Sequence, residues 1–421
     1  MNGDDLQQLL GELGDARFCT NPVRLHRLDP AGGPGRTVTV ACKDRRAAVC
    51  SRVYKGDAWH LVAAGLEGGK GLPATVAHHP RLFVTLTAPS FGSVHHVRPD
   101  GGCHPDGGGR QCGHGRCVGC PERHAEGDPR LGEPLCPACF DYPGAVLWNA
   151  HASKLWQATT LAVRRRLAEH AGIPRRALPD LARLSFAKVV EFQRRGLVHL
   201  HAVVRLDGPD GPTSPPPAGW DTPLVARAVA DAASVTVAST AGGRVGWGPQ
   251  RAVVLLDHEE GSLAVAAYVA KYATKTSDDD GALAHRLRSL RELHGLKLRP
   301  HQETLVRSAW RLAGRPEHAS LRLQLHAHTY GYPGHHLTKS RRYSTTFGAL
   351  RRARTAEALD RLETDAREDD AGPWLYAGRG YRHPDAAFYL DALEAAAAGF
   401  GGSPAFPAGS TVGSPGRPHR C

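Results

Sequence analysis

Two histidines stand one residue apart in the stretch QRRGLVHLHAVVRLDG, residues 193–208, which otherwise has the composition of a buried strand. Successive side chains of a strand point to opposite faces, so His199 and His201 share one face and Leu200 lies on the other. Two imidazoles on one face are either a pair of metal ligands or polar residues on a solvated sheet surface. The segments around the two histidines distinguish between these interpretations.

A carboxylate joins the histidines if the segments on either side of Arg194, Arg195 and Gly196 pair as a β-hairpin. These segments are ARLSFAKVVEFQ and LVHLHAVVRL. With a three-residue loop whose glycine takes the left-handed conformation, Glu191 lies opposite His199 on the same face. Such a mixed nitrogen and oxygen set suits Mg²⁺ or Mn²⁺ with open positions for water and substrate. A loop one residue longer or shorter would turn Glu191 away.

A helix that carries candidate nucleophiles is predicted over residues 261–281, GSLAVAAYVAKYATKTSDDDG, because its interior is rich in alanine. We expect Ser262 to cap its start and Gly281 to lie beyond its end. Four side chains fall on neighbouring rows of one face: Tyr268, Lys271, Tyr272 and Lys275. The tyrosines either pack against a sheet or act as a pair of nucleophiles.

The elements that must position these residues follow a recognisable order. Periodicity predicts strands and helices in the order βαββαβ, which is the split βαβ arrangement. The predicted segments are strand 80–90, helix 146–172, strands 182–193 and 197–206, helix 222–236 and strand 251–257. We therefore expect an α+β fold in which an antiparallel sheet has its helices on one face.

A cysteine-rich insertion, residues 103–142, separates the first of these strands from the long helix. Cys117-x-x-Cys120 and Cys136-x-x-Cys139 are separated by fifteen residues, a spacing at which two tight turns hold one tetrahedral Zn²⁺. Five further ligand types remain for a second ion or an alternative set: Cys103, His104, Cys112, His114 and His124. A structural zinc site is favoured over a redox or disulfide role.

Three other cysteines precede the first strand, at Cys19, Cys42 and Cys50. They form a further possible zinc site or are buried apolar residues, and the sequence does not separate the two. The last residue, Cys421, ends a Pro, Gly and Ser-rich segment, 401–421, with the composition of a disordered tail.

The charge of the chain indicates a polyanionic partner. The 421 residues carry a net charge of +12, and phosphate is the anion most often bound by such proteins. No run reaches the roughly 18 apolar residues of a membrane helix, and the start has no secretory signal. We therefore expect a cytoplasmic protein without a membrane partner, whose cysteines are metal ligands or free thiols.

Three short motifs of this chain resemble those of HUH-type rolling-circle replication initiators and occur in the same order. They are FVTLT (83–87), HLH (199–201) and YVAKY (268–272). Longer stretches are similar to initiators of actinobacterial plasmids and integrative elements: TLTAPSFG, GCPERH, LCPACFDYPGAVLWNAH, EFQRRGLVHLHAVVRLDG, AAYVAKYATK and TKSRRYSTTFGALR. The resemblance covers most of residues 19–355. Within it Cys112, Cys120, His124, Cys136 and Cys139 are the steadier positions, and Cys117 is the departure.

The resemblance implies an HUH endonuclease that nicks one strand of origin DNA, single-stranded or extruded as a hairpin. Tyr268, our expected initiator, would attack the scissile phosphate, leaving a 5′-phosphotyrosine and a free 3′ hydroxyl. Tyr272 would then serve strand closure or only pack against the sheet. Lys271 would offset phosphate or phenolate charge, beside the metal of His199 and His201. Because the chain has no G-x-x-x-x-G-K-[ST] phosphate loop, a host helicase and a DNA polymerase are expected partners.

A basic segment near the end of the resemblance, 335–354, interleaves cations, hydroxyls and aromatics, as a phosphate-tracking surface would. A solvated basic helix is the alternative. The expected DNA contacts are Lys275, Lys339, Arg341, Arg342, Tyr343, Arg351 and Arg352. The predicted domains are 1–75, an N-terminal cysteine-containing region; 76–300, a nicking domain with a zinc-binding insertion at 103–142; 301–355, a basic DNA-contacting region; and 356–421, a partly disordered extension.

Two other classes of protein compete with this interpretation. A conjugative relaxase or a transposase of the HUH class would use the same phosphotyrosine chemistry. Relaxases usually carry their tyrosine before the histidine pair, whereas Tyr268 follows His201, and such transposases are commonly much shorter. A non-catalytic, zinc-dependent DNA-binding regulator is the alternative outside the enzymes.

Overall fold

The computed structural model of this chain describes residues 3–16, 19, 21–27, 35–40, 48–98, 101–105, 109–256, 259–273, 283, 285–353, 375–386 and 389–390. The chain divides into two compact units. The larger comprises Asp57–Phe347, and the smaller combines Met1–Gly56 with Gly348–Arg420. The division falls within helix α2, Ala48–Glu67. Each unit is described by itself.

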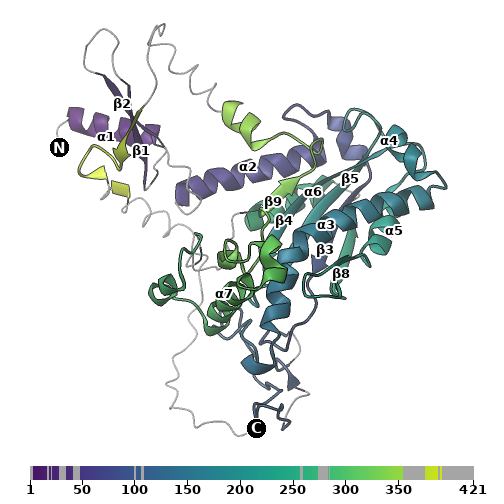
Figure 1. Ribbon diagram of the computed structural model, residues 1–421. Coiled ribbons are helices and arrows are strands. Elements are labelled where there is room, and N and C mark those ends of the chain that lie inside the picture. Colours follow the sequence, from purple (N-terminus) through teal and green to yellow (C-terminus); the bar gives the residue numbers. More distant parts are fainter. Residues whose placement is uncertain are drawn as a thin grey trace. The chain divides into compact units, whose positions relative to one another are not determined.

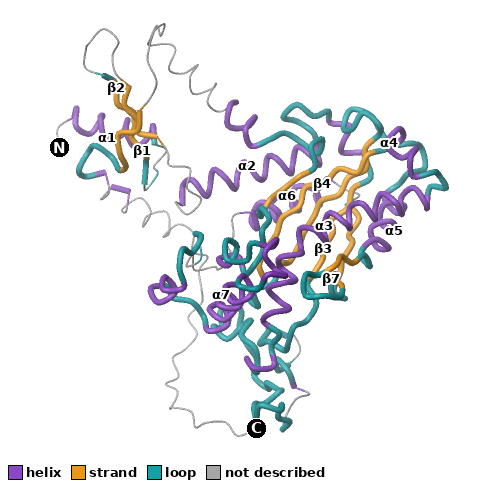
Figure 2. Tube along the Cα trace, in the orientation of Figure 1, coloured by secondary structure: helices purple, strands orange, loops and turns teal. Residues whose placement is uncertain are grey.

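A five-stranded antiparallel sheet organises the larger unit (Figures 1 and 2). Its strand order is β8-β3-β5-β4-β9. The strands are β3 (Arg81–Thr87), β4 (Arg183–Phe192), β5 (Val198–Asp207), β8 (Arg251–Leu255) and β9 (Leu337–Lys339). Antiparallel pairing and separate helical layers agree with an α+β fold, and β9 adds an edge strand that the periodicity did not predict.

Two helices, α3 (Tyr142–His170) and α5 (Thr222–Ala232), cover one face of this sheet (Figure 1). Asp141 and Asp221 cap them, each accepting a hydrogen bond from a backbone N–H three residues on. The even-numbered residues of β5 face these helices and are buried, because alternation along the strand sends one apolar set to the core: Val198, Leu200, Ala202, Val204 and Leu206.

The other face of the sheet carries His199 and His201 and meets helix α6, Glu259–Ala273. The two helices of the predicted βαββαβ order, α3 and α5, do share one face of the sheet, whereas α6, which was predicted apart from that order, lies on the opposite face. The helix also begins three residues before the predicted cap, so Ser262 lies inside its first turn. Gly281 lies outside the described residues.

The hairpin between β4 and β5 has the predicted three-residue loop. Gln193 N–H donates to the carbonyl of Leu197 at 2.9 Å, and Gly196 takes a φ of +73°. That conformation is accessible to glycine without steric cost. The resulting register pairs Glu191 with His199, as the sequence predicted.

A buried polar network stabilises the end of the sheet remote from this loop. Asp207 accepts hydrogen bonds from Arg205 and from Ser185 Oγ, and it lies 2.8 Å from Nδ1 of His79. Arg205 also donates to the carbonyl of Gly65 on α2. Arg205 and Asp207 are fully buried, so each charge depends on the other.

The larger unit contains further short elements around this core. Helix α7 (Pro300–Ala313) buries Leu305 and Val306 against it. The remaining helices are α4 (Leu178–Leu181), η1 (Ala74–His78), η3 (Pro137–Cys139), η4 (Arg175–Ala177), η5 (Leu290–Gly295), η6 (Pro316–Leu321) and η7 (Ala327–Thr329). Strands β6 (Thr236–Ala238) and β7 (Arg244–Gly246) form a separate two-stranded sheet.

The smaller unit joins the two ends of the chain through a three-stranded sheet. Its order is β10-β1-β2, with β1 (Val23–Arg27), β2 (Arg36–Val40) and β10 (Leu375–Arg379), beside helix α1 (Gly3–Asp15). Glu12 is buried there, and Thr39 and the backbone N–H groups of Arg382 and His383 donate to it. The predicted tail, 401–421, lies outside the described residues. Among those described, no helix combines the length and the apolar character needed to cross a membrane.

Candidate active site

The two histidines of β5 are held by two threonines of β3. Register pairs His201 with Thr85 and His199 with Thr87. The Oγ1 of Thr85 lies 3.1 Å from Nδ1 of His201, and that of Thr87 lies 3.0 Å from Nδ1 of His199. Hydrogen bonds at Nδ1 orient each ring and direct Nε2 away from the strand pair, which is how metal-ligating histidines are commonly held.

Glu191 approaches the same two rings from β4. Its Oε2 lies 3.8 Å from Nε2 of His201, and it is half-buried. The ring centroids of His199 and His201 are 4.5 Å apart. Two imidazoles and one carboxylate thus lie on one side of the sheet, and these are residue types that divalent ions accept as ligands.

Burial sets the protonation state of His199. Removal from water, together with the neighbouring His201, lowers the pKa of His199 to about 4, although Glu191 acts in the opposite sense. The ring is therefore neutral at physiological pH. A neutral imidazole offers the lone pair that a metal ion binds.

Helix α6 places Tyr268 directly over this donor set. Its hydroxyl lies 3.2 Å from Nε2 of His201, and the side chain is 37% exposed, so the phenol is accessible. Phe83 of β3 stacks on the ring of His201 at 5.6 Å and meets the ring of Tyr268 edge-on at 5.7 Å. Such contacts hold two rings in a fixed relation.

Three residues of β3 thus belong to the site although we did not predict them as site residues: Phe83, Thr85 and Thr87. The signal was available in the FVTLT motif, since residues at alternate positions of one strand share a face. What the sequence did not show is that β3 pairs with β5 in the register that brings these side chains to the histidines.

The other predicted residues of this helix are placed only in part. Lys271 is exposed on α6, three residues after Tyr268. Tyr272 belongs to α6, but its side chain is not among those described. Lys275 lies outside the described residues.

A groove of about 550 Å³ lies at the end of the sheet nearest His199. Ala88, which directly follows Thr87 in the chain, and the hairpin residues Arg194 and Arg195 border it. Arg195 donates to the carbonyls of Ala88 and Pro89, so the hairpin and the end of β3 are tied together. Its full lining is Ala88, Ser90, Gly92, Ser93, Val94, His95, His96, Val97, His104, Leu131, Gly132, Gln193, Arg194, Arg195, Pro249 and Gln250.

The cysteine-rich insertion gathers two separate groups of four ligand atoms. The first group is His95, Cys103, Cys120 and His124, and the second is Cys112, His114, Cys136 and Cys139. In each group all ligand atoms lie within 4.8 Å of one another. Hydrogen bonds from the backbone N–H groups of His114 and Arg116 lower the pKa of Cys112 to about 6, which favours the thiolate that metals bind.

This arrangement differs from the four-cysteine set that spacing indicated. Cys120 and Cys136 belong to different groups, and Cys117 joins neither. Spacing along the chain could not show this division, because Cys120-x-x-x-His124 and Cys136-x-x-Cys139 each pair with ligands far away in sequence. His95, which we did not predict, lies eight residues after the end of β3 as one of two adjacent histidines.

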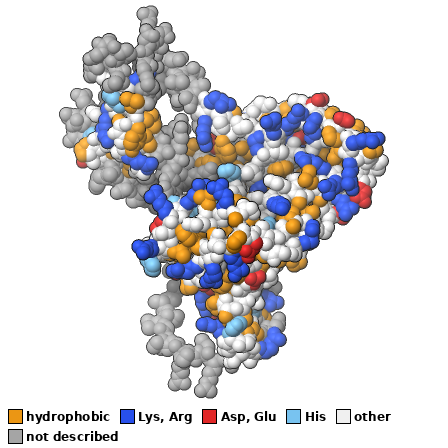
Figure 3. Space-filling view, in the orientation of Figure 1, with side chains coloured by type: hydrophobic (Ala, Val, Ile, Leu, Met, Phe, Trp, Pro, Cys, Tyr) orange, Lys and Arg blue, Asp and Glu red, His pale blue; other side chains and the backbone are white. Residues whose placement is uncertain are grey.

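The basic segment is exposed only in part. Arg341, Arg342, Arg351 and Arg352 are exposed, whereas Lys339 is half-buried and donates to the carbonyls of Ser340, Arg341 and Ser344. The prediction that Tyr343 contacts DNA is wrong for this conformation, because its side chain is fully buried and its hydroxyl donates to the carbonyl of Val62. Figure 3 shows many lysine and arginine side chains and few acidic ones on the visible face of the larger unit.

The structure is consistent with both interpretations of the N-terminal cysteines, a zinc site or buried apolar residues. The Sγ atoms of Cys19 and Cys50 lie 3.8 Å apart, and both residues are buried with Ala16 in a small apolar cluster. Cys42 lies outside the described residues. Within the part of the chain that the structure describes, no set of three ligand residues includes Cys19 or Cys50.

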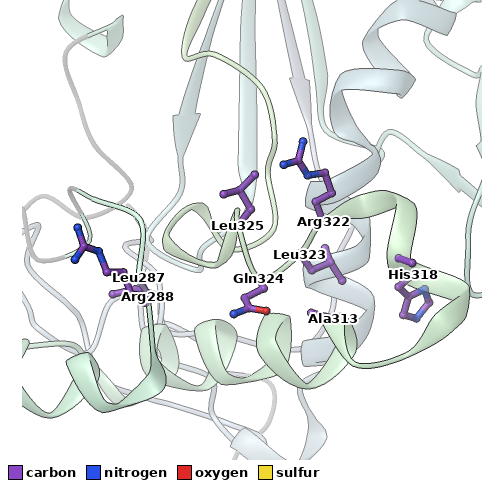
Figure 4. A pocket seen from close by; sticks show the side chains of 9 residues that line it. Leu287, Arg288, Ala313, His318, Arg322, Leu323, Gln324 and Leu325 are labelled. Atoms are coloured by element: carbon purple, nitrogen blue, oxygen red, sulfur yellow. The ribbon is translucent and has the colours of Figure 1, made fainter.

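A second cavity, of about 370 Å³, lies beside α7 and contains none of the predicted site residues (Figure 4). It is lined by Leu287, Arg288, Ala313, His318, Ala319, Arg322, Leu323, Gln324 and Leu325. Neither a predicted nucleophile nor a predicted metal ligand reaches it, so the chemistry is assigned to the face of β5.

Comparisons with known proteins agree with the motif order. The model of the family described as "RepSA: Replication initiator protein, pSAM2" matches residues 5–395. A curated protein of Streptomyces ambofaciens described as "Replication initiator protein" is 44% identical over 388 residues, which are 86% of this chain and 81% of the relative. No solved structure matches the chain.

Proposed function

Since this chain belongs to the RepSA family of replication initiator proteins, we propose that it starts rolling-circle replication by nicking one strand of origin DNA through a phosphotyrosine intermediate. The observation that carries the proposal is the 3.2 Å separation between the hydroxyl of Tyr268 and Nε2 of His201. The proposed nucleophile and the proposed metal ligands therefore lie side by side on an accessible face.

The residues present fit a divalent ion, because they combine two imidazoles that are oriented at Nδ1 with a carboxylate. His199, His201 and Glu191 would hold Mg²⁺ or Mn²⁺, which when bound would polarise the scissile phosphate. Thr85 and Thr87 keep the imidazoles in place. Phe83 shields one side of His201 from water by stacking on it.

Tyr268 is the proposed nucleophile. Its phenol oxygen forms the bond to phosphorus while the bond from phosphorus to the 3′ oxygen breaks, and the phenol proton leaves to solvent. The products are a 5′-phosphotyrosine and a 3′ hydroxyl from which a polymerase can extend. Lys271, exposed on the same helix, offsets negative charge on the phosphate.

The groove beside His199 gives the single strand a path to this face. Arg194 and the carbonyl-bonded Arg195 border it, and positive charge at the hairpin attracts the phosphate backbone. In this proposal a host helicase separates the strands, because the chain has no phosphate-loop motif, and a host polymerase extends the 3′ end.

The test is a nicking assay on a supercoiled plasmid that carries the DNA flanking the gene. We expect His199→Ala with His201→Ala to abolish nicking and to leave duplex binding largely intact, because binding rests on many phosphate contacts. Nicking by the double variant at the wild-type rate would overturn the proposal. Duplex binding without nicking by the wild-type protein, at any divalent ion concentration, would favour a non-catalytic regulator.

A further inference from the structure

We propose that the insertion binds two zinc ions, one in each ligand group, and that the ion of the first group holds the hairpin beside His199. The first group supplies two thiolates and two imidazoles, and the second supplies three thiolates and one imidazole. Tetrahedral sets of sulfur and nitrogen select zinc among the common divalent ions.

The distances within the first group are close to those of a tetrahedron around one ion. Bonds of about 2.0–2.1 Å to nitrogen and 2.3 Å to sulfur place tetrahedral ligand atoms about 3.3–3.8 Å apart. Nε2 of His124 lies 3.0 Å from Nδ1 of His95 and 3.5 Å from Sγ of Cys120. Sγ of Cys103 lies 4.0 Å from Nδ1 of His95.

A carboxylate supports this assignment by orienting one ligand. Oδ2 of Asp128 lies 2.7 Å from Nδ1 of His124, which leaves Nε2 directed at the other three atoms. A carboxylate on the remote nitrogen is the usual support of a zinc-bound histidine. His124, Cys103 and Cys120 are all buried, so the polar atoms of this group are kept from water.

A competing group shares Cys103 with His96 and His104, but it has only three ligand atoms. The four-atom group is therefore the better site for an ion.

The second group is built on two tight turns. Cys139 N–H donates to the carbonyl of Cys136 at 3.1 Å, and Gly115 N–H donates to that of Cys112 at 2.9 Å. Nδ1 of His114 lies 3.2 Å from Sγ of Cys139 and 3.9 Å from Sγ of Cys136. Three cysteines and one histidine are a set of ligands that completes a tetrahedral zinc site.

The first group is tied to the β4–β5 hairpin by backbone contacts. Arg194 donates to the carbonyl of Asp128, the residue that orients His124, at 3.2 Å. Gly132 N–H donates to the carbonyl of His95 at 2.8 Å. Arg299 then donates to the carbonyls of Leu131 and Arg194, at 2.9 and 2.7 Å. An ion that fixes His95 and His124 therefore also fixes the segment against which the hairpin rests.

Zinc X-ray absorption of the purified full-length protein tests the ligand sets without any variant. Two ions share five thiolates and three imidazoles, so we expect two zinc ions per chain with averages of 2.5 sulfur and 1.5 nitrogen ligands. One zinc with four sulfur ligands would restore the four-cysteine set and overturn the proposal. A protein that contains no zinc would also overturn it.

Single substitutions separate the two sites. Cys103→Ser and Cys112→Ser should each lower the zinc content from two to one, because each removes one ligand from a different group. Cys117→Ser is the matched control and should keep two ions, since Cys117 belongs to neither group. A loss of zinc from the control would contradict the assignment, and so would two ions in Cys103→Ser. The absorption measurement stands whether or not a variant folds.

Hydrogen exchange tests the link to the hairpin. We expect Cys103→Ser to raise exchange at the amides of Gly196 and Leu197 about tenfold or more over wild type, while Cys112→Ser leaves those amides near the wild-type rate. If the amides of Gly196 and Leu197 were equally protected in both variants, the first ion would not be what holds the hairpin. This readout is independent of nicking, so it can fail while the proposed function holds.

Discussion

Thr85 and Thr87 contribute one hydrogen bond each to the imidazoles that form the candidate metal site. Neither threonine touches the ion in our proposal, so both are positioning residues. Their hydroxyls select which ring nitrogen faces the donor set. A side chain of the same shape without a hydroxyl would leave the strand intact and release the ring.

We predict that Thr85→Val weakens the binding of Mn²⁺ by about 10-fold or more, because the groups that orient a metal-bound histidine typically contribute that much. Isothermal titration with Mn²⁺ measures the affinity. Thr304→Val, at a half-buried threonine of α7 that bonds to the carbonyl of Pro300 and to neither histidine, is the control and should bind Mn²⁺ as the wild type does. Unchanged affinity in Thr85→Val would show that the hydroxyl does not orient His201.

The roles of the two tyrosines also belong to single residues. We expect Tyr268→Phe to lose the covalent adduct with a single-stranded origin oligonucleotide, because only a phenol oxygen can attack phosphorus. Tyr272→Phe should keep the adduct and fail to rejoin strands. A denaturing gel resolves the adduct. The opposite pattern would exchange the roles, and an adduct in the double variant would remove α6 from the reaction.

The buried network around Asp207 joins strands β4 and β5 to the segment that contains His79. Arg205 and Ser185 donate to its carboxylate, and the donors of β4, β5 and the His79 segment meet there. Burial alone would raise the pKa of this carboxyl, but His79 and Arg205 outweigh burial and lower it. The ionised carboxylate is thus part of the fold that aligns β5, and with it the two histidines.

We predict that Asp207→Asn lowers the free energy of unfolding by about 3 kcal/mol or more at pH 7, since Arg205 would be left as a buried charge without its partner. A lowered pKa contributes stability that is fully present above the unfolded value of about 3.9 and is lost as the pH falls from there through the folded value. Urea unfolding at pH 7 and pH 2 should show the variant closer to wild type at pH 2. Asp180→Asn, on an exposed site, is the control. If the free energy of unfolding differed between variant and wild type by the same amount at both pH values, the ionised Asp207 would not be the source of the stability.

The hairpin loop is the second element on which the site depends. Gly196 has a φ of +73°, and a Cβ at this position would collide with Leu305. We expect Gly196→Ala to destabilise the larger unit by about 1–3 kcal/mol. It should also reduce nicking by shifting Glu191 relative to His199. Thermal unfolding and the plasmid assay measure both. Gly172→Ala is the control, because Gly172 also has a positive φ but has open space around it. Its effect measures the backbone strain alone, without a collision with a neighbouring side chain.

The charge of the whole molecule governs its encounter with DNA. A net charge of +12 favours any nucleic acid, so affinity alone does not identify the origin. The exposed arginines after β9 are candidates for phosphate contacts rather than for base recognition.

We expect Arg341→Ala with Arg342→Ala to weaken binding to origin and unrelated DNA alike. The slope of log affinity against log salt should fall by about 2, because each lost phosphate contact removes about 0.9. Fluorescence anisotropy over a range of salt concentrations measures it. Arg164→Ala with Arg165→Ala, exposed on α3, makes the same change in charge and should leave the slope unchanged. If both double substitutions lowered the slope equally, these arginines would act through the overall positive potential of the protein rather than through local phosphate contacts.

Local sequence signals were sufficient for strands β3, β4, β5 and β8, for helices α3, α5 and α6, and for the face of the hairpin. Alternation placed His199 and His201 together, and a glycine in a three-residue loop placed Glu191 opposite His199, because both rules act within one or two neighbouring elements. The α+β class and the family followed from the same local patterns taken in order.

Only the tertiary structure decided which distant residues complete each site. It brought Thr85 and Thr87 to the histidines, placed α6 on the face opposite to α3 and α5, and buried Tyr343. It also divided the cysteines between two groups, each with a histidine. Spacing along a chain constrains ligands that share one turn. Which turns meet depends on how strands register and how the insertion folds back, and these are set by contacts between segments far apart in sequence.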